Sequence, residues 1–168
     1  LLKTMLKNDL KLSGNNISKR IALNLYGTFP VIYAAAMHMN VVAVRWKWQI
    51  AENAKTLSSS HEYPEMNHNE IVGWCRPRSL LKEFMIINLR DKKDHPRVKI
   101  RMDVTNSILK RSGFKVMELI SKGDTLLSRM MSLVYIGDFV SFYLAVLNKI
   151  DPTPVERIAY LKGKLAGK

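Results

Sequence analysis

Three polar side chains recur at helical spacing in a segment that is otherwise mostly apolar. Arg45, Gln49 and Glu52 stand at positions i, i+4 and i+7, which places them on one face of a helix. A carboxylate held one turn from an amide and two turns from a guanidinium is oriented, as a group that transfers protons must be. A salt-bridge ladder exposed to solvent is the alternative, and the pattern by itself favours that interpretation.

A second group of polar side chains fills residues 61–70, which contain two His and three Glu. His and carboxylate side chains are zinc ligands, but the spacing is not the His-Glu-x-x-His of zinc proteases, and Pro64 prevents a regular helix. The segment is therefore interpreted either as an irregular active-site loop or as a polar surface loop. In the first case His68, flanked by two Asn, is an acid or base near neutral pH.

The last helical segment, residues 154–166, carries a lysine on its apolar face. Lys162 lies near the centre of that face, where a charge needs a partner. The lysine either lines a cleft that binds an anion, or packs by its stem while its amine reaches water, and the pattern does not choose between them. The apolar face is made of Val155, Ile158, Leu161 and Leu165.

Several kinds of chemistry lack their usual sequence motifs. No Gly-x-Gly-x-x-Gly, Walker or Gly-x-Ser-x-Gly motif occurs, which disfavours nucleotide cofactors and hydrolysis by such a serine. Cys75 is the only cysteine and has no neighbouring His or second Cys, so we interpret it as structural. A single cysteine cannot form an internal disulfide, and this fits a cytoplasmic protein.

The composition is that of a globular protein, with 47% hydrophobic and 24% charged residues. No apolar run reaches the roughly 18 residues that cross a bilayer, so no membrane association is expected. The net charge of +13 raises the possibility of nucleic-acid binding. The basic residues, however, are spread along the chain, as on a solvated surface, and nucleic acid is not the expected partner. The start Leu-Leu-Lys-Thr, without Met or signal peptide, suggests part of a longer protein.

Short apolar runs alternate with helix-length segments, which predicts a parallel sheet in a three-layer α/β/α sandwich. In the helix at 41–58, Val41, Val44, Trp48 and Ala51 are predicted to pack in the core. Asp124 or Thr125 is the expected N-cap of the longest helix. The predicted strands are 29–34, 83–90 and 114–120, the last at an edge, and the predicted helices are 3–25 with a break at 13–16, 41–58, 95–112, 124–148 and 154–166.

Several segments, taken in order, resemble the bifunctional phosphoglucose/phosphomannose isomerases of archaea and bacteria. The resemblance extends over nearly the whole chain from about Asn15, and several linked motifs are more specific than any one of them. The segments are Pro30-Val-Ile-Tyr33, Val42-Ala-Val-Arg45-Trp-Lys-Trp-Gln-Ile-Ala-Glu52-Asn-Ala-Lys55, Pro64-Glu-Met-Asn-His68-Asn-Glu-Ile-Val-Gly-Trp74, Leu89-Arg-Asp-Lys-Lys-Asp-His-Pro-Arg97, Gly137-Asp-Phe-Val-Ser-Phe-Tyr-Leu-Ala145 and Asp151-Pro-Thr-Pro-Val-Glu-Arg-Ile-Ala-Tyr-Leu-Lys162.

The resemblance implies a sugar-isomerase (SIS) domain, a flavodoxin-like, five-stranded parallel sheet between helices. Proteins of this family contain two SIS domains, of which this chain would be the second. Residues 1–28 would be an inter-domain linker and N-terminal helix, 29–151 the SIS domain, and 152–168 a C-terminal helix carrying an active-site lysine. The family usually has Gly or Ser where Ala34–Ala36 stand here, so we expect no phosphate cradle there.

The resemblance also implies the roles of individual residues. It makes Glu52 the catalytic base, brings His68 to the active site of the partner subunit of a homodimer, and sets Lys162 near the ring oxygen. The further substrate-binding residues would be Arg45, Gln49 and Asn67.

The implied reaction interconverts glucose 6-phosphate or mannose 6-phosphate with fructose 6-phosphate through a cis-enediolate. It requires no cofactor or metal, because a proton moves rather than a hydride. The phosphate-gripping loops would belong to the first SIS domain, so this part alone is expected to be inactive. The alternative is a non-catalytic, sugar-phosphate-binding regulatory module, against which the retained Glu52, His68 and Lys162 argue.

Overall fold

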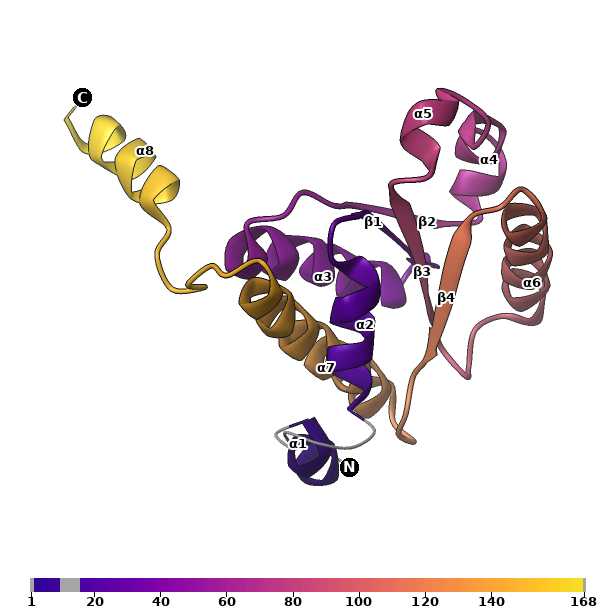
Figure 1. Ribbon diagram of the computed structural model, residues 1–168. Helices are drawn as coiled ribbons and strands as arrows, with labels where there is room; N and C mark the ends of the chain where they lie inside the picture. The colour runs from indigo at the N-terminus through magenta and orange to yellow at the C-terminus, as the bar shows by residue number, and fades with distance from the viewer. Residues whose placement is uncertain (1, 10–15, 168) are drawn as a thin grey trace.

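The computed structural model describes residues 2–9 and 16–167, in which four parallel strands alternate with helices (Figure 1). The strand order is β2-β1-β3-β4, and each neighbouring pair is parallel. The elements are α1 (Leu2–Asp9), α2 (Ile17–Leu25), β1 (Phe29–Ala35), α3 (Met39–Ala54), β2 (Ser59–Tyr63), the 3₁₀ turn η1 (Glu65–Asn67), α4 (Glu70–Gly73), α5 (Arg78–Leu81), β3 (Phe84–Arg90), α6 (Pro96–Arg111), β4 (Lys115–Ile120), α7 (Leu126–Leu147) and α8 (Glu156–Ala166).

Helices cover both faces of the sheet. Side chains alternate along β1, so that Ile32 and Ala34 pack with α2, α3 and α7, whereas Val31 and Tyr33 pack with α6 and η1. In Figure 1, α6 lies on the opposite side of the sheet from α2, α3 and α7. The predicted three-layer α/β/α fold is confirmed.

The three predicted strands are present, and β4 is an edge strand as expected. The fourth strand, β2, was not predicted, because its Ser-Ser-His-Glu-Tyr sequence is polar and only Tyr63 is buried. Residues 61–70 are therefore not irregular throughout, since the segment begins as an edge strand paired with β1. The sheet of the described residues has four strands, not the five that the family resemblance implies.

The predicted core face of α3 is wrong. Val41 and Trp48 are 53% and 61% exposed, Ala51 is exposed, and Val44 is only half-buried. Because α3 carries apolar residues on more than one face, the spacing alone did not identify the face that packs on the sheet. The buried residues are Met39, Val42, Ala43, Trp46, Ile50 and Ala54.

The long helix α7 packs against α2 and α3, and one glycine makes its closest approach possible. The buried indole of Trp46 lies directly against the backbone of Gly137 and donates its Nε1–H to the carbonyl oxygen of Leu133 at 2.9 Å. As predicted, α7 begins at an N-cap, and Thr125 and Ser128 form a capping box there.

By length and composition alone, α7 also resembles a membrane-spanning helix. It has 22 residues, and an 18-residue window within it has a mean hydropathy of 1.8. Arg129 and Asp138 interrupt the helix, so it contains no continuous apolar run of that length. In the fold, 44% of this window is buried inside the protein, and the helix packs against α2 and α3.

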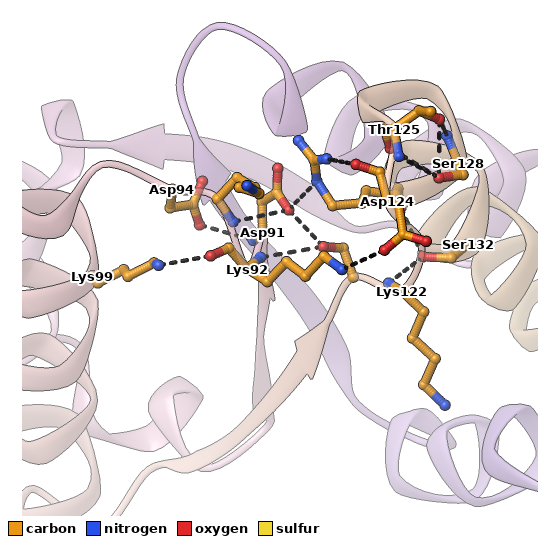
Figure 2. A network of polar contacts seen from close by, with 12 residues as sticks. Asp91, Lys92, Asp94, Lys99, Lys122, Asp124, Thr125, Ser128 and Ser132 are labelled. Carbon is orange, nitrogen blue, oxygen red and sulfur yellow. Dashed lines mark hydrogen bonds and ion pairs between the residues drawn. The ribbon is translucent and has the colours of Figure 1, made fainter.

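A charged network closes the carboxyl ends of β3 and β4 (Figure 2). Asp91, 6% exposed, accepts hydrogen bonds from Ser121 Oγ and Arg129 Nε, both at 2.7 Å. Arg129 also donates to the backbone oxygen of Asp124 at 2.9 Å, just before α7. Burial by itself raises the pKa of Asp91, but the hydrogen bonds from Ser121 and Arg129 outweigh it and lower that pKa below its ordinary value. The network fixes the start of α7 against the sheet.

Candidate active site

Glu52 lies near the C-terminus of α3, and its side chain is exposed. Within the part of the chain that the structure describes, its carboxylate makes neither a hydrogen bond nor an ion pair, and Glu52 lines neither the cavity beside Glu70 nor the one beside Trp74. This chain by itself therefore leaves the carboxylate open on the α3 face of the domain.

Arg45 and Gln49 lie along the seam between α3 and α7 and do not form a ladder with Glu52. The Arg45 guanidinium donates from Nε and Nη2 to the two carboxylate oxygens of Asp138, at 3.2 and 2.9 Å. This hydrogen-bonded pairing raises the pKa of Arg45. Gln49 accepts from Asn53 at 3.0 Å, and Asn53 also donates to Ser141 of α7 at 2.8 Å. These hydrogen bonds from Arg45 and Asn53 thus hold α3 and α7 together.

The loop after β2 carries Asn67 and His68. Asn67 Nδ2 donates to Thr105 Oγ1 of α6 at 2.8 Å, and Thr105 is 1% exposed. The backbone N–H of His68 donates to the carbonyl oxygen of Glu65 at 2.9 Å, whereas the His68 side chain is exposed. Asn67 therefore anchors the loop to α6, and His68 is left facing outward.

A buried phenol supports the same loop. Tyr33 of β1 donates a short hydrogen bond to Glu70 and accepts one from Trp74 Nε1 at 2.9 Å. Burial, followed by the contact with Glu70, raises the pKa of Tyr33, so the phenol stays protonated and donates. The other Glu70 oxygen lies 3.4 Å from His61 Nδ1. Sequence reasoning missed this arrangement, because Tyr33 lies far from Glu70 along the chain.

A cavity of about 310 Å³ opens beside these residues. Three carboxylates contribute to its walls, so it is poorly suited to a phosphate group. Among the described residues, no group of three or more His, Cys, Asp or Glu side chains is arranged to hold a metal ion. The lining residues are Asn40, Val44, Ser60, His61, Glu62, Glu65, Met66, Asn69 and Glu70.

Glu52 and His68 lie at opposite ends of the sheet in one chain. Strand β1 leads into the N-terminus of α3 at the carboxyl edge of the sheet, and Glu52 comes about 20 Å further along the helix axis, towards the edge where β2 begins. His68 follows the end of β2, at the carboxyl edge. A single copy therefore does not bring the two side chains together.

Lys162 lies on α8, which is connected to the Glu52 end of the domain. Asn148, after α7, donates to the Ala54 carbonyl oxygen at 2.9 Å, and Lys55 Nζ donates to that of Pro152 at 3.2 Å. From there α8 projects away from the sheet (Figure 1). The described residues leave Lys162 exposed, together with Ile158, Leu161 and Leu165 of the predicted apolar face. Val155, the fourth residue of that face, is half-buried.

Known structures share this fold. A glucose-6-phosphate isomerase like protein from Thermus thermophilus superposes with a TM-score of 0.72 at 20% sequence identity, over 89% of this chain and 51% of that one. At this identity the likeness establishes the fold alone.

Curated relatives add likeness in sequence. The bifunctional phosphoglucose/phosphomannose isomerase of Caldicellulosiruptor bescii is 46% identical over 151 residues, which cover 90% of this chain and 44% of the relative. The protein of the same name from Aquifex aeolicus is 40% identical over 163 residues, covering 97% and 50%. The chain thus spans about half the length of the curated relatives it matches.

A family model provides the assignment. The model described as the bacterial phospho-glucose isomerase C-terminal SIS domain matches residues 14–165, which include the sheet, α3, α7 and nearly all of α8. The chain therefore belongs to the family of bacterial phosphoglucose isomerase C-terminal SIS domains, as its sequence motifs suggested.

Proposed function

We propose that this chain is the C-terminal half of an aldose–ketose isomerase that interconverts glucose 6-phosphate or mannose 6-phosphate with fructose 6-phosphate. The observation that carries the proposal is the family match over residues 14–165, supported by relatives named as bifunctional isomerases. The exposure of Glu52, His68 and Lys162 is compatible with it, because a substrate held by a second half must reach them from outside this domain. We place the enzyme in the cytoplasm, in keeping with the single, unpaired cysteine of this chain.

In the proposed reaction Glu52 moves a proton between two carbons. After the ring opens, its carboxylate takes the proton from C2 and returns it to C1 through a cis-enediolate, and one carboxylate serves for both transfers. His68 and Lys162 act at the ring oxygen. Gln49 contacts the sugar, as does Arg45 with the donors that Asp138 leaves unused. Asn67, predicted to bind the substrate, has its amide turned towards Thr105 and serves the site by holding the loop that carries His68. Glucose and mannose phosphates differ only at C2 and give the same enediolate, so one base serves both if the substrate can turn about its C2–C3 bond.

We further propose a homodimer in which His68 of one copy completes the site that holds Glu52 of the other. The support is topological, because the two residues lie at opposite ends of the sheet within one copy. A two-fold axis that places the carboxyl edge of one sheet beside the α3 face of the other would form two equivalent sites.

The test uses the complete polypeptide of which this chain is a part. Glu52→Gln keeps the shape of the side chain but removes the base, so turnover of both sugar phosphates is expected to fall by about 10³-fold or more while substrate binding persists. Glu83→Gln, an exposed acid before β3, is the matched control and should turn over normally. Normal turnover by Glu52→Gln would remove Glu52 from its role.

Mixing two inactive variants tests the shared site. If His68 acts across the dimer, subunits carrying Glu52→Gln and His68→Ala should regain about a quarter of wild-type activity when unfolded and reassembled together, since half the dimers are mixed and each has one intact site. Reassembled mixtures that stay inactive, although mixed dimers are present by mass spectrometry, would show that the site is not shared in this way.

A further inference from the structure

A second cavity lies on the face of the sheet opposite α3, and the proposed isomerase reaction does not use it. Its volume is about 550 Å³, within the range that holds small organic ligands. It opens between the α4–α5 segment, the end of α6 and the start of β4, at the amino edge of the sheet. The lining residues are Trp74, Cys75, Arg78, Leu81, Lys82, Ser112, Gly113 and Phe114.

The aromatic wall of this cavity is rigid. Trp74 donates from Nε1 to the buried Tyr33 phenol oxygen at 2.9 Å. Its ring also makes edge-to-face contacts with Phe84 and Phe114, with centroid distances of 5.6 and 5.0 Å. Because these contacts hold the indole in place, a ligand ring would meet a preformed apolar surface and would not have to order it.

The remaining lining is cationic. Arg78 makes no ion pair with any residue that the structure describes, and Lys82 has only a loose contact of 3.7 Å with the exposed Glu83. Arg76 and Arg111 directly adjoin lining residues in the sequence and are also exposed. Part of the excess positive charge of the chain is therefore concentrated around one aromatic cavity.

We propose that this cavity binds a small organic anion made of a flat ring and phosphate groups, the class to which nucleoside phosphates belong. The ring would lie against Trp74 and Phe114, and the guanidinium fork of Arg78 matches phosphate geometry, with Lys82 adding a second charge. Recognition would rely on side chains, since the chain has no glycine-rich phosphate loop. This site is separate from Glu52, and it stands or falls independently of the isomerase proposal.

Cys75 provides a direct test, because it is the only cysteine, is exposed and lines the cavity. Its alkylation by uncharged iodoacetamide is followed by mass spectrometry, with ATP without added metal as the probe. Saturating ATP is expected to slow alkylation about threefold or more, because the bound ligand covers the thiol. Adenosine lacks the phosphates, and tripolyphosphate and glucose 6-phosphate lack the flat ring, so each should protect less at equal concentration.

Substitutions of the basic cavity residues test whether ATP protects Cys75 by binding in this cavity. Arg78→Ala and Lys82→Ala should each raise the ATP concentration for half-maximal protection by about fivefold, the size of one exposed ion pair. Arg101→Ala, at an exposed arginine of α6 away from the cavity, should not change it. The rate without ligand is measured for each variant, so that altered thiol reactivity is not mistaken for altered binding. An alkylation rate that ATP leaves unchanged, equal protection by tripolyphosphate or glucose 6-phosphate, or full protection in both cavity variants would overturn the proposal.

Discussion

Replacing Gly137 by Ala is expected to destabilise the domain, even though alanine favours helix. A Cβ built at this position would lie 2.5 Å from both Cδ1 and Cε2 of Trp46, and closer still to Nε1. To reach ordinary contact at about 3.5 Å, the indole or α7 must shift by more than about 1 Å. Trp46 is 1% exposed and closely surrounded, so it has little room to yield.

The magnitude follows from three contributions. Overpacking a core costs about 1–3 kcal/mol, and losing the hydrogen bond from Trp46 to the Leu133 carbonyl leaves a buried donor unpaired, at about 1–3 kcal/mol more. The higher helix propensity of alanine offsets about 1 kcal/mol. The expected net loss in the free energy of unfolding is about 1–5 kcal/mol.

Urea unfolding followed by far-ultraviolet circular dichroism measures this loss. Gly163→Ala is the matched control, because Gly163 lies inside α8 with no atom within 4 Å of the added Cβ, and it should not destabilise the protein. Combining Gly137→Ala with Trp46→Leu should cost clearly less than the sum of the two single changes, since the clash is then gone. If Gly137→Ala unfolds within about 0.5 kcal/mol of the wild type, the tight approach of α7 to Trp46 is refuted.

Two further predictions concern buried polar contacts. Asp91→Asn leaves Arg129 with an unpaired buried charge and should lower the free energy of unfolding by about 3–5 kcal/mol in urea at neutral pH. Because folding lowers the pKa of Asp91, this carboxylate stabilises the fold above its unfolded pKa of 3.8, and the stabilisation disappears as the pH falls through the lower folded pKa. The variant should therefore lose this part of the pH dependence of stability. Identical acid-unfolding profiles of the variant and the wild type would contradict the prediction. Thr105→Val removes the oxygen that accepts a hydrogen bond from Asn67 Nδ2 and should lower the free energy of unfolding by about 1–3 kcal/mol. Ser107→Ala, on the exposed side of α6, should be nearly neutral. Equal effects of the two substitutions would refute the anchoring role of Asn67.

The sequence predicted those parts of the fold that local pattern determines. The strands around Ile32 and Ile87 are mostly apolar and buried on both faces, and Thr125 is a residue typical of a helix start. The strand β2 was missed, because an edge strand with one buried residue has neither an apolar run nor a clear alternation. The face of α3 that packs on the sheet was also predicted wrongly, because apolar residues lie on more than one face of this helix.

The candidate site was less accessible to sequence reasoning, because its contacts join distant parts of the chain. Arg45 and Asp138 are 93 positions apart, and only the fold shows that the guanidinium is already engaged. A lone acid in the apolar α7 was a usable signal that a cation lies opposite. The family resemblance supplied Glu52 and His68, but their separation across the sheet follows from the topology.

The uncovered C-terminal helix has a consequence for how this domain behaves by itself. Ile158, Leu161 and Leu165 are 43%, 58% and 63% exposed on a helix of 11 residues, a length at which an isolated helix is marginal in water. The helical conformation of α8 then depends on the protein surface that covers these aliphatic side chains. Amide exchange along α8 is therefore expected to be fast in the lone domain and slow in the assembled enzyme, so its rate would report on assembly.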